Sequence, residues 1–206
     1  MPQTPPDLSA YDFTDFKRRV WRMTDAEFYD YYDRVYREVG FFDYTLTNLE
    51  HFVQWIRGDF LEVGCSSGQT LRAVCAACNR CVGADICDYA LEIARRGNGR
   101  RRIEYVKCDA EKELPFSDGE FDCVLCGHTL EHLRDPKAAV DELFRVSRGS
   151  VVVVIPLQGP EQRWKKTNLH IQFWPTVESF EDFCGRKAWE SRVVRDGTCG
   201  VMRFRV

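Results

Sequence analysis

The sequence lacks an apolar run long enough to cross a membrane. The longest run, residues 151–156, has the length of one buried strand, whereas a membrane-spanning helix needs about 20 consecutive apolar residues. The first residues, MPQTPPDLSAYDF, contain neither a basic stretch nor an apolar stretch of the kind that opens a secretory signal. We therefore expect a cytoplasmic protein that does not insert into membranes.

An excess of positive charge, internal repeats and low-complexity tracts are also missing. The 206 residues carry 29 Lys and Arg against 32 Asp and Glu, which gives a formal net charge of −3. Nonspecific electrostatic binding of a nucleic acid duplex is therefore not expected, although the cations at 163–166 would allow a local basic patch. With 44% hydrophobic and 30% charged residues, the chain has the composition of a globular domain with a core.

Cysteine, by contrast, is plentiful. Buried free thiols, a metal or iron–sulfur cluster on the CxxC spacings of residues 75–81, and internal disulfides are three possible explanations. Buried thiols are favoured, because most of these residues fall inside apolar segments. The ten positions are 65, 75, 78, 81, 87, 108, 123, 126, 184 and 199.

Residues 1–58 read as a helical cap. The patterns Thr24 to Glu27 and Thr47 to Glu50 match capping boxes, and Gly40 and Gly58 stand where helices would end. The segment is rich in aromatic side chains, which are expected either to pack as a core or to close over a pocket. They are Phe28, Tyr29, Tyr31, Tyr32, Tyr36, Phe41, Phe42 and Tyr44.

Residues 59–206 alternate short apolar runs with helical segments. The expected strands are 60–63, 81–85, 103–106, 121–126 and 151–156, and the expected helices are 70–78, 89–96 and 136–146. Segments 189–195 and 198–206 read as an antiparallel hairpin around Asp196-Gly197. The pattern predicts an α/β fold with a Rossmann-like, doubly wound and mostly parallel sheet, helices on both faces and an antiparallel C-terminal hairpin.

Chemistry is expected at the carboxyl ends of the parallel strands, where open α/β sheets bind ligands. The first strand leads into a turn with Gly64 and Gly68, which lets the backbone approach a ligand closely, and Glu62 precedes it. Asp85 ends the second strand, where a carboxylate can accept the hydroxyl groups of a ribose. Asp109 follows the third strand and is placed to reach an adenine amino group.

Four segments together resemble the class I S-adenosylmethionine-dependent methyltransferases of the group that includes ubiquinone and biotin biosynthesis enzymes. They are LEVGCSSG (61–68), VGADI (82–86), CDAEKELPFSDGEFD (108–122) and HTLEHLRDP (128–136). The resemblance implies that S-adenosyl-L-methionine is the cofactor and that residues 59–206 form the domain that binds it. The resemblance further implies which part of the cofactor each residue contacts. The methionine part would be contacted by Glu62, Gly64, Cys65 and Gly68, the ribose by Asp85, and the adenine by Ile86, Asp109 and Ala110. The border between cofactor and substrate would be formed by Gly127 and His128.

Three of the four histidines fall where a substrate is expected. His128, Glu131 and His132 would share one face of a helical turn, and His170 lies in a loop before a helix that opens at Pro175. One interpretation is that these residues orient the loops by hydrogen bonds. A second is a divalent metal site, because imidazole and carboxylate are suitable ligands. In a third, which we adopt with no metal assigned, His128 or His170 is the general base.

The resemblance implies methyl transfer to an oxygen or nitrogen atom of a small-molecule acceptor, by a protein that is a monomer or a homodimer. Residues 1–58 and the 157–173 loop are expected to form a lid over the acceptor. An RNA-end methyltransferase and a non-catalytic cofactor-binding module are the two alternatives. The first is suggested by the histidine cluster and the local cations but disfavoured by the net charge.

Overall fold

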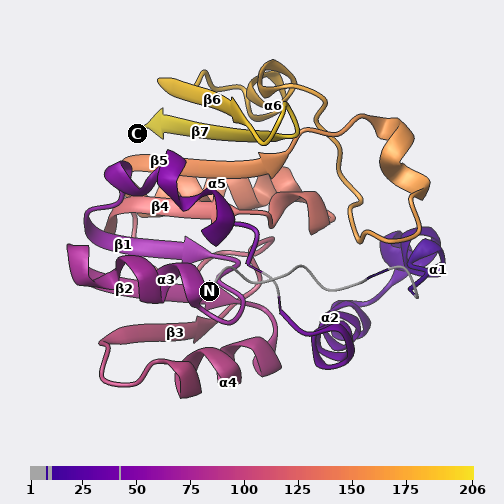
Figure 1. Cartoon of the computed structure of the whole chain (residues 1–206), viewed down its shortest axis with the longest axis horizontal. Coiled ribbons are helices and arrows are strands. Elements are labelled where there is room, and N and C mark those ends of the chain that lie inside the picture. The colour runs from indigo at the N-terminus through magenta and orange to yellow at the C-terminus, as the bar shows by residue number, and fades with distance from the viewer. Residues whose placement is uncertain (1–7, 9–10, 42) are drawn as a thin grey trace.

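Seven strands form one sheet in the computed structural model, which describes residues 8, 11–41 and 43–206. The strand order is β3-β2-β1-β4-β5-β7-β6, and the first five strands are parallel (Figure 1). The order reverses between β1 and β4, which is the switch point where such sheets bind ligands. The bounds are β1 Gly58–Val63, β2 Cys78–Asp85, β3 Ile103–Lys107, β4 Phe121–Gly127, β5 Ser147–Pro156, β6 Glu190–Val194 and β7 Cys199–Arg205.

The fold class expected from the sequence is confirmed, and so is the hairpin at its end. β7 runs antiparallel to both β5 and β6. Asp196 and Gly197 have φ values of +53° and +88°, and the Thr198 N–H donates to the Arg195 carbonyl across the turn. The hairpin therefore extends the parallel sheet with two antiparallel strands.

Helices cover both faces of the sheet. α5 and α6 pack on one face, while α3, α4 and η3 pack on the other, and each face buries its own apolar cluster (Figure 1). Asp135 caps α5 through the Ala138 N–H and Pro136 opens it, as the sequence predicts. The bounds are α3 Gln69–Val74, η4 Cys75–Ala77, α4 Asp88–Gly97, η5 Leu130–His132, α5 Pro136–Val146, η6 Pro160–Trp164 and α6 Val177–Cys184.

α1 (Thr14–Arg19) and α2 (Asp25–Val39) lie at the end of the sheet toward which the parallel strands point (Figure 1). Thr24 and Glu27 form a reciprocal capping box on α2, and Gly40 ends α2 with φ +85°, so both predictions are confirmed. Phe16, Val20, Phe28 and Tyr32 form a third apolar cluster with Ile171. The bounds are α1 Thr14–Arg19, η1 Val20–Arg22, α2 Asp25–Val39, η2 Leu46–His51 and η3 Val53–Trp55.

Two local predictions in this half of the chain are wrong. The second capping box does not form, because Thr47 lies inside η2, where its hydroxyl donates to the Tyr44 carbonyl, and Asp43 accepts from the Leu46 N–H instead. Gly58 does not end a helix; with φ +67° it begins β1. The helical segment expected at 70–78 is confirmed: α3 is followed directly by the 3-10 turn η4, which ends at Ala77, and β2 begins at Cys78.

The helix expected to open at Pro175 begins two residues later. Thr176 is its N-cap and forms a capping box with Ser179, so the threonine hydroxyl rather than the proline ring defines the start of α6. Phe42 and the residues before Leu8 lie outside the described residues. None of the helices in the described part combines the length and hydrophobicity needed to span a bilayer.

All ten cysteines are free thiols. Seven are buried, and Cys75, Cys78 and Cys108 are partly buried. Cys75 to Cys81 run from η4 into β2, so the CxxC spacing here belongs to a helix end and a strand.

Candidate functional site

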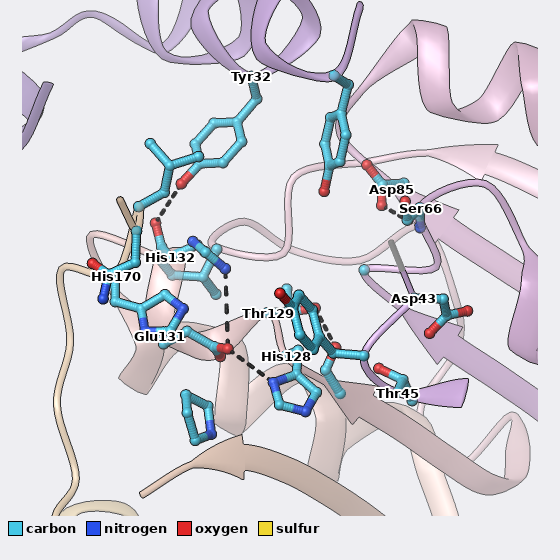
Figure 2. Close-up of a pocket in the computed structure, with 18 of the residues that line it drawn as sticks. Tyr32, Asp43, Thr45, Ser66, Asp85, His128, Thr129, Glu131, His132 and His170 are labelled. Carbon is cyan, nitrogen blue, oxygen red and sulfur yellow. Dashed lines mark hydrogen bonds and ion pairs between the residues drawn. The ribbon is translucent and has the colours of Figure 1, made fainter. Parts of the chain in front are cut away.

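A cavity of about 540 Å³ lies at the carboxyl ends of the parallel strands, beneath α2 and beside residues 157–173, a segment we call the strap (Figure 2). Its volume falls in the range of small-molecule sites. Of the residues proposed from the sequence, those that line it are Glu62, Gly64, Cys65, Asp85, Ile86, Asp109, Ala110, Gly127, His128 and His170. The fold therefore brings together ten of the eleven.

Two carboxylates from neighbouring strands occupy one end of the cavity. Asp85 accepts backbone N–H groups from Ser66 at 2.7 Å and from Cys87 at 2.9 Å, which joins β2 to the turn after β1 (Figure 2). Burial raises the pKa of Asp85, although these hydrogen bonds act in the opposite direction. Glu62 is 2% exposed, and burial with the nearby Asp43 and Asp85 raises its pKa well above the usual value.

Glu62 leaves one buried oxygen, Oε2, without a hydrogen-bond partner among the described residues. An unpaired buried acceptor is costly in a folded protein. Because the oxygen belongs to a residue that lines the cavity, a donor supplied by a bound ligand would satisfy it.

The glycine turn after β1 shapes the wall between this end and the rest of the cavity. Gly64 has φ +77°, and a Cβ there would collide with the side chain of Thr129. Gly68, with φ +72°, is the N-cap of α3 and does not line the cavity. The structure therefore places Gly64 and Cys65 in the cavity and Gly68 behind it.

Asp109 is already engaged by the N-terminal cap. The Tyr29 hydroxyl donates to Asp109 Oδ2 at 2.7 Å, and the Glu111 N–H donates to Oδ1 at 2.9 Å. Burial and then this contact raise the pKa of Tyr29, so its hydroxyl stays protonated and donating. Asp109 thus ties α2 to the loop after β3 besides lining the cavity.

The other end of the cavity carries imidazoles. His128 follows β4 with φ +50°, and its Nδ1 lies 3.4 Å from Glu131 Oε1 (Figure 2). Asn48 Nδ2 lies 3.4 Å and Cys199 Sγ 4.0 Å from its Nε2. His128 lies outside the turn of η5, so positive φ rather than helical spacing brings it to Glu131.

The charges of this group are unequal. Burial alone would lower the pKa of His128, but contacts with Cys199 and Glu131 raise it to about 9. Burial alone would raise the pKa of Glu131, but His128 and the other imidazoles lower it to about 2. At neutral pH the two form a buried imidazolium–carboxylate pair.

His170 has the opposite character. Burial and the neighbouring His132 lower its pKa to about 3, so its ring is neutral. Its Nδ1 lies 2.8 Å from Gln158 Oε1, and since an amide oxygen only accepts, the Nδ1–H donates and the lone pair is left on Nε2.

Glu131, His132 and His170 also form a group of possible metal ligands. One ligand atom from each lies within 4.8 Å of the others, and burial lowers the pKa of His132. Two neutral imidazoles and a carboxylate are a donor set that divalent transition metals accept.

Several residues of the site had no sequence motif to mark them. Asp43 lines the cavity and accepts both the N–H and the hydroxyl of Thr70 at 3.0 Å, which fixes the start of α3. Asn48 and Cys199 contact His128 from segments that are distant in sequence. The aromatic side chains of the N-terminal cap both pack as a core and border the cavity. Phe28, Tyr32 and Tyr36 line the cavity and also belong to the third apolar cluster.

Comparison with known proteins gives consistent results. Residues 61–155 match a family described as a methyltransferase domain. The chain is 33% identical over 171 residues to a demethylmenaquinone methyltransferase of Clavibacter sepedonicus, covering 69% of each. It is 31% identical over 101 residues to the ajmaline N-methyltransferase of Rauvolfia serpentina, covering 47% of this chain but 35% of that relative.

Solved structures share the fold at low sequence identity. An S-adenosylmethionine-dependent methyltransferase of Mesorhizobium loti superposes with a TM-score of 0.60 at 15% identity, covering 72% of this chain and 90% of that one. A Haloferax volcanii protein solved in complex with the Trm112 methyltransferase activator gives 0.65 at 16% identity and covers 98% of both. The [4+2]-cyclase SpnF gives 0.63 at 18% identity over 78% of this chain and 79% of its own, so the fold alone does not specify the reaction.

Proposed function

Because the chain belongs to the S-adenosylmethionine-dependent methyltransferase family, we propose that it transfers a methyl group from S-adenosyl-L-methionine to an oxygen or nitrogen atom of a small-molecule acceptor. The observation that carries this proposal is a single cavity with carboxylates at one end and imidazoles at the other. Named relatives that act on demethylmenaquinone and ajmaline support a small-molecule acceptor.

The cavity has the features that the cofactor requires. Glu62 presents a buried oxygen that no described residue supplies with a donor, and Asp85 has both oxygens fixed by backbone N–H groups, with a further lone pair on each. Gly64 and Cys65 would border the methionine part, Asp85 would take the ribose, and Gly68 would act only through the start of α3. Ile86, Asp109 and Ala110 would border the adenine, and Gly127 would lie next to the acceptor.

When bound, the cofactor supplies a methyl group on a positively charged sulfur, which needs little covalent help from the protein. The work of the chain is therefore to orient the acceptor, exclude water and receive a proton. His170 is suited to the last task, because it is neutral and its unprotonated Nε2 is the ring atom not held by Gln158. His128, held as an imidazolium by Glu131, is suited to orient an acceptor oxygen that gains negative charge.

The strap and the N-terminal helices supply the cover. Glu131 accepts the N–H groups of Ile171 and Gln172 through its backbone carbonyl, which anchors the strap beside His170. We propose that residues 1–58 and the strap act as the lid over the domain of residues 59–206, in a cytoplasmic protein that works as a monomer or homodimer.

The first test separates cofactor binding from catalysis. Calorimetry should detect binding of S-adenosylhomocysteine, and Asp85→Asn should weaken it at least about tenfold, whereas the exposed control Glu113→Gln should leave it unchanged. His170→Gln should keep that affinity and lose turnover in a methyl-release assay over a panel of phenols, quinols and amines. A surface control, His51→Gln, should retain turnover.

Each outcome has a distinct meaning. Absence of binding by the wild-type protein would refute the cofactor assignment. Binding without turnover on any acceptor would favour a cofactor-binding module. Equal loss of affinity and turnover in His170→Gln would exclude its role as the base, and thermal melts of the variants would reveal misfolding.

A further inference from the structure

Two short segments, far apart in sequence, each combine basic residues with an exposed tryptophan. Residues 17–22 read KRRVWR and residues 163–166 read RWKK, which together hold seven Lys and Arg and no acidic residue. In a chain with a net charge of −3, this is a local excess of positive charge. The first segment spans α1 and η1, and the second joins η6 to the rest of the strap.

The fold holds these segments against each other. Lys17 Nζ donates to the carbonyls of Arg163 at 2.8 Å and Lys165 at 2.9 Å, and to Asn168 Oδ1 at 2.6 Å. The Phe13 N–H donates to the Lys166 carbonyl at 2.9 Å. Figure 1 shows the strap descending onto α1 at the side of the molecule away from the sheet.

A groove of about 290 Å³ lies between them, separate from the cavity described above. Its lining contains Arg18, Trp21, Arg163 and Trp164, with Lys17, His170 and Ile171. None of these side chains is acidic. His170 lines both the groove and the cavity, so the groove adjoins the imidazole end of the site.

Lys17 is fully engaged by the strap, but the two tryptophans and two arginines of the groove have no ring or ion-pair partner among the described residues. Trp21 and Trp164 are 55% and 56% exposed, and neither ring is stacked on another ring or on a cation of the described residues. Trp189 is a useful contrast: it is 49% exposed, but Arg205 lies 3.2 Å and Arg203 4.8 Å from its ring centre.

Arg18 and Arg163 likewise form no ion pair with a described residue, whereas Arg19, next to Arg18, pairs with Asp15. Guanidinium groups recognise phosphate through paired, charge-assisted hydrogen bonds. Free indole faces stack on planar rings, which adds affinity with little dependence on the identity of the ring.

From this combination we propose that the groove is a binding site for an aromatic phosphate, the chemistry that a nucleotide presents. The ring stacks on Trp21 and Trp164, and the phosphate pairs with Arg18 and Arg163. The concave shape and the small volume fit a discrete group rather than a membrane surface. The site stands independently of methyl transfer and is tested by binding alone.

The experiment uses adenosine monophosphate as the probe, titrated into the full chain while tryptophan fluorescence is followed. The probe contains adenosine and could also bind at the proposed cofactor site. The titration is therefore done with saturating S-adenosylhomocysteine and repeated with the Asp85→Asn variant, so that binding at that site does not contribute to the signal. Adenosine and inorganic phosphate, each carrying half of the chemistry, should bind at least about tenfold more weakly. A short 5′-phosphorylated oligonucleotide then distinguishes a free nucleotide from the end of a nucleic acid.

Variants locate the site. Arg18→Gln with Arg163→Gln, and separately Trp164→Ala, should weaken the probe at least about tenfold. Asp85→Asn and the matched control Trp189→Ala should leave its affinity unchanged, whether or not the cofactor assignment holds. Equal weakening in Trp189→Ala, no binding at about 5 mM probe, or binding only to vesicles containing phosphatidylglycerol would each overturn the proposal.

Discussion

At the scale of single residues, the main feature of the site is the buried pair of His128 and Glu131. Their side chains are 14% and 1% exposed, and the 3.4 Å contact joins an imidazolium to a carboxylate that accepts no well-formed hydrogen bond from described residues. Removal of one partner from a buried charged pair strongly destabilises the folded protein, because it leaves the other charge buried without a partner. The groups that face His128 from other elements are Cys199, Asn48 and Tyr44.

This pair predicts a pH dependence of stability. The pKa of His128 is raised from 6.5 to about 9, so its contribution is complete below pH 6.5 and is lost as the pH rises through 9. The difference in unfolding free energy between the wild-type protein and His128→Gln should therefore shrink between these pH values. Urea denaturation at pH 6, 7.5 and 9.5 measures it.

A difference that stays constant over this range would contradict the raised pKa. Glu131→Gln supplies the complementary control, because without the carboxylate the pKa of His128 should fall and the Cys199 contact remains to raise it.

At the scale of elements, the sequence predicted those whose signal is local. The five parallel strands coincide with apolar runs, and α5 begins where Asp135 and Pro136 predict and ends at the expected Val146. Thr47 and Glu50 carry the same motif as Thr24 and Glu27, yet only Thr24 and Glu27 form a capping box. A capping motif indicates that a capping box can form at that position, whereas contacts with the rest of the fold determine whether it forms.

The two threonines make a matched pair for experiment. Thr24→Ala removes the side chain that accepts the Glu27 N–H, so we expect a loss of about 1 kcal/mol in the free energy of unfolding. Thr47→Ala removes an exposed hydroxyl that donates to the Tyr44 carbonyl and accepts from Arg195 Nη1 at 3.4 Å, and should cost a few tenths of that. Denaturant melts of both variants decide the matter, and equal losses would contradict it.

The site was predictable to the extent that it is built from strand ends. Asp85 follows an apolar run directly, so its position could be inferred from the sequence. Asp43, Asn48 and Cys199 come from an irregular loop, a 3-10 turn and a hairpin strand, and no motif marks them. Tertiary contacts alone bring them to the cavity, so sequence patterns could not reveal them.

At the scale of the whole molecule, one buried lysine connects the first helix to the strap. Lys17 is 4% exposed, and burial lowers its pKa to about 8. Its three acceptors lie 146 to 151 residues away along the sequence. The strap that carries His170 is therefore held by a residue of the N-terminal helix.

Replacement of this lysine should release the strap while the sheet stays intact. Lys17→Met leaves three acceptors without their donor, which we expect to cost about 1–3 kcal/mol. Limited proteolysis should then cut within residues 157–173 faster than in the wild-type protein or in the exposed control Lys165→Met. An unchanged cleavage rate would show that the apolar contacts of Ile171 suffice.

Two of the three groups that hold Lys17 are main-chain carbonyls, which every amino acid provides. The attachment to Lys17 therefore depends on the path of the strap and on Asn168, not on the side chains of residues 163–166. Arg163, Trp164, Lys165 and Lys166 could be exchanged in a library without undoing the closure over the cavity. The strap is thus a natural place to re-engineer which molecules this scaffold accepts.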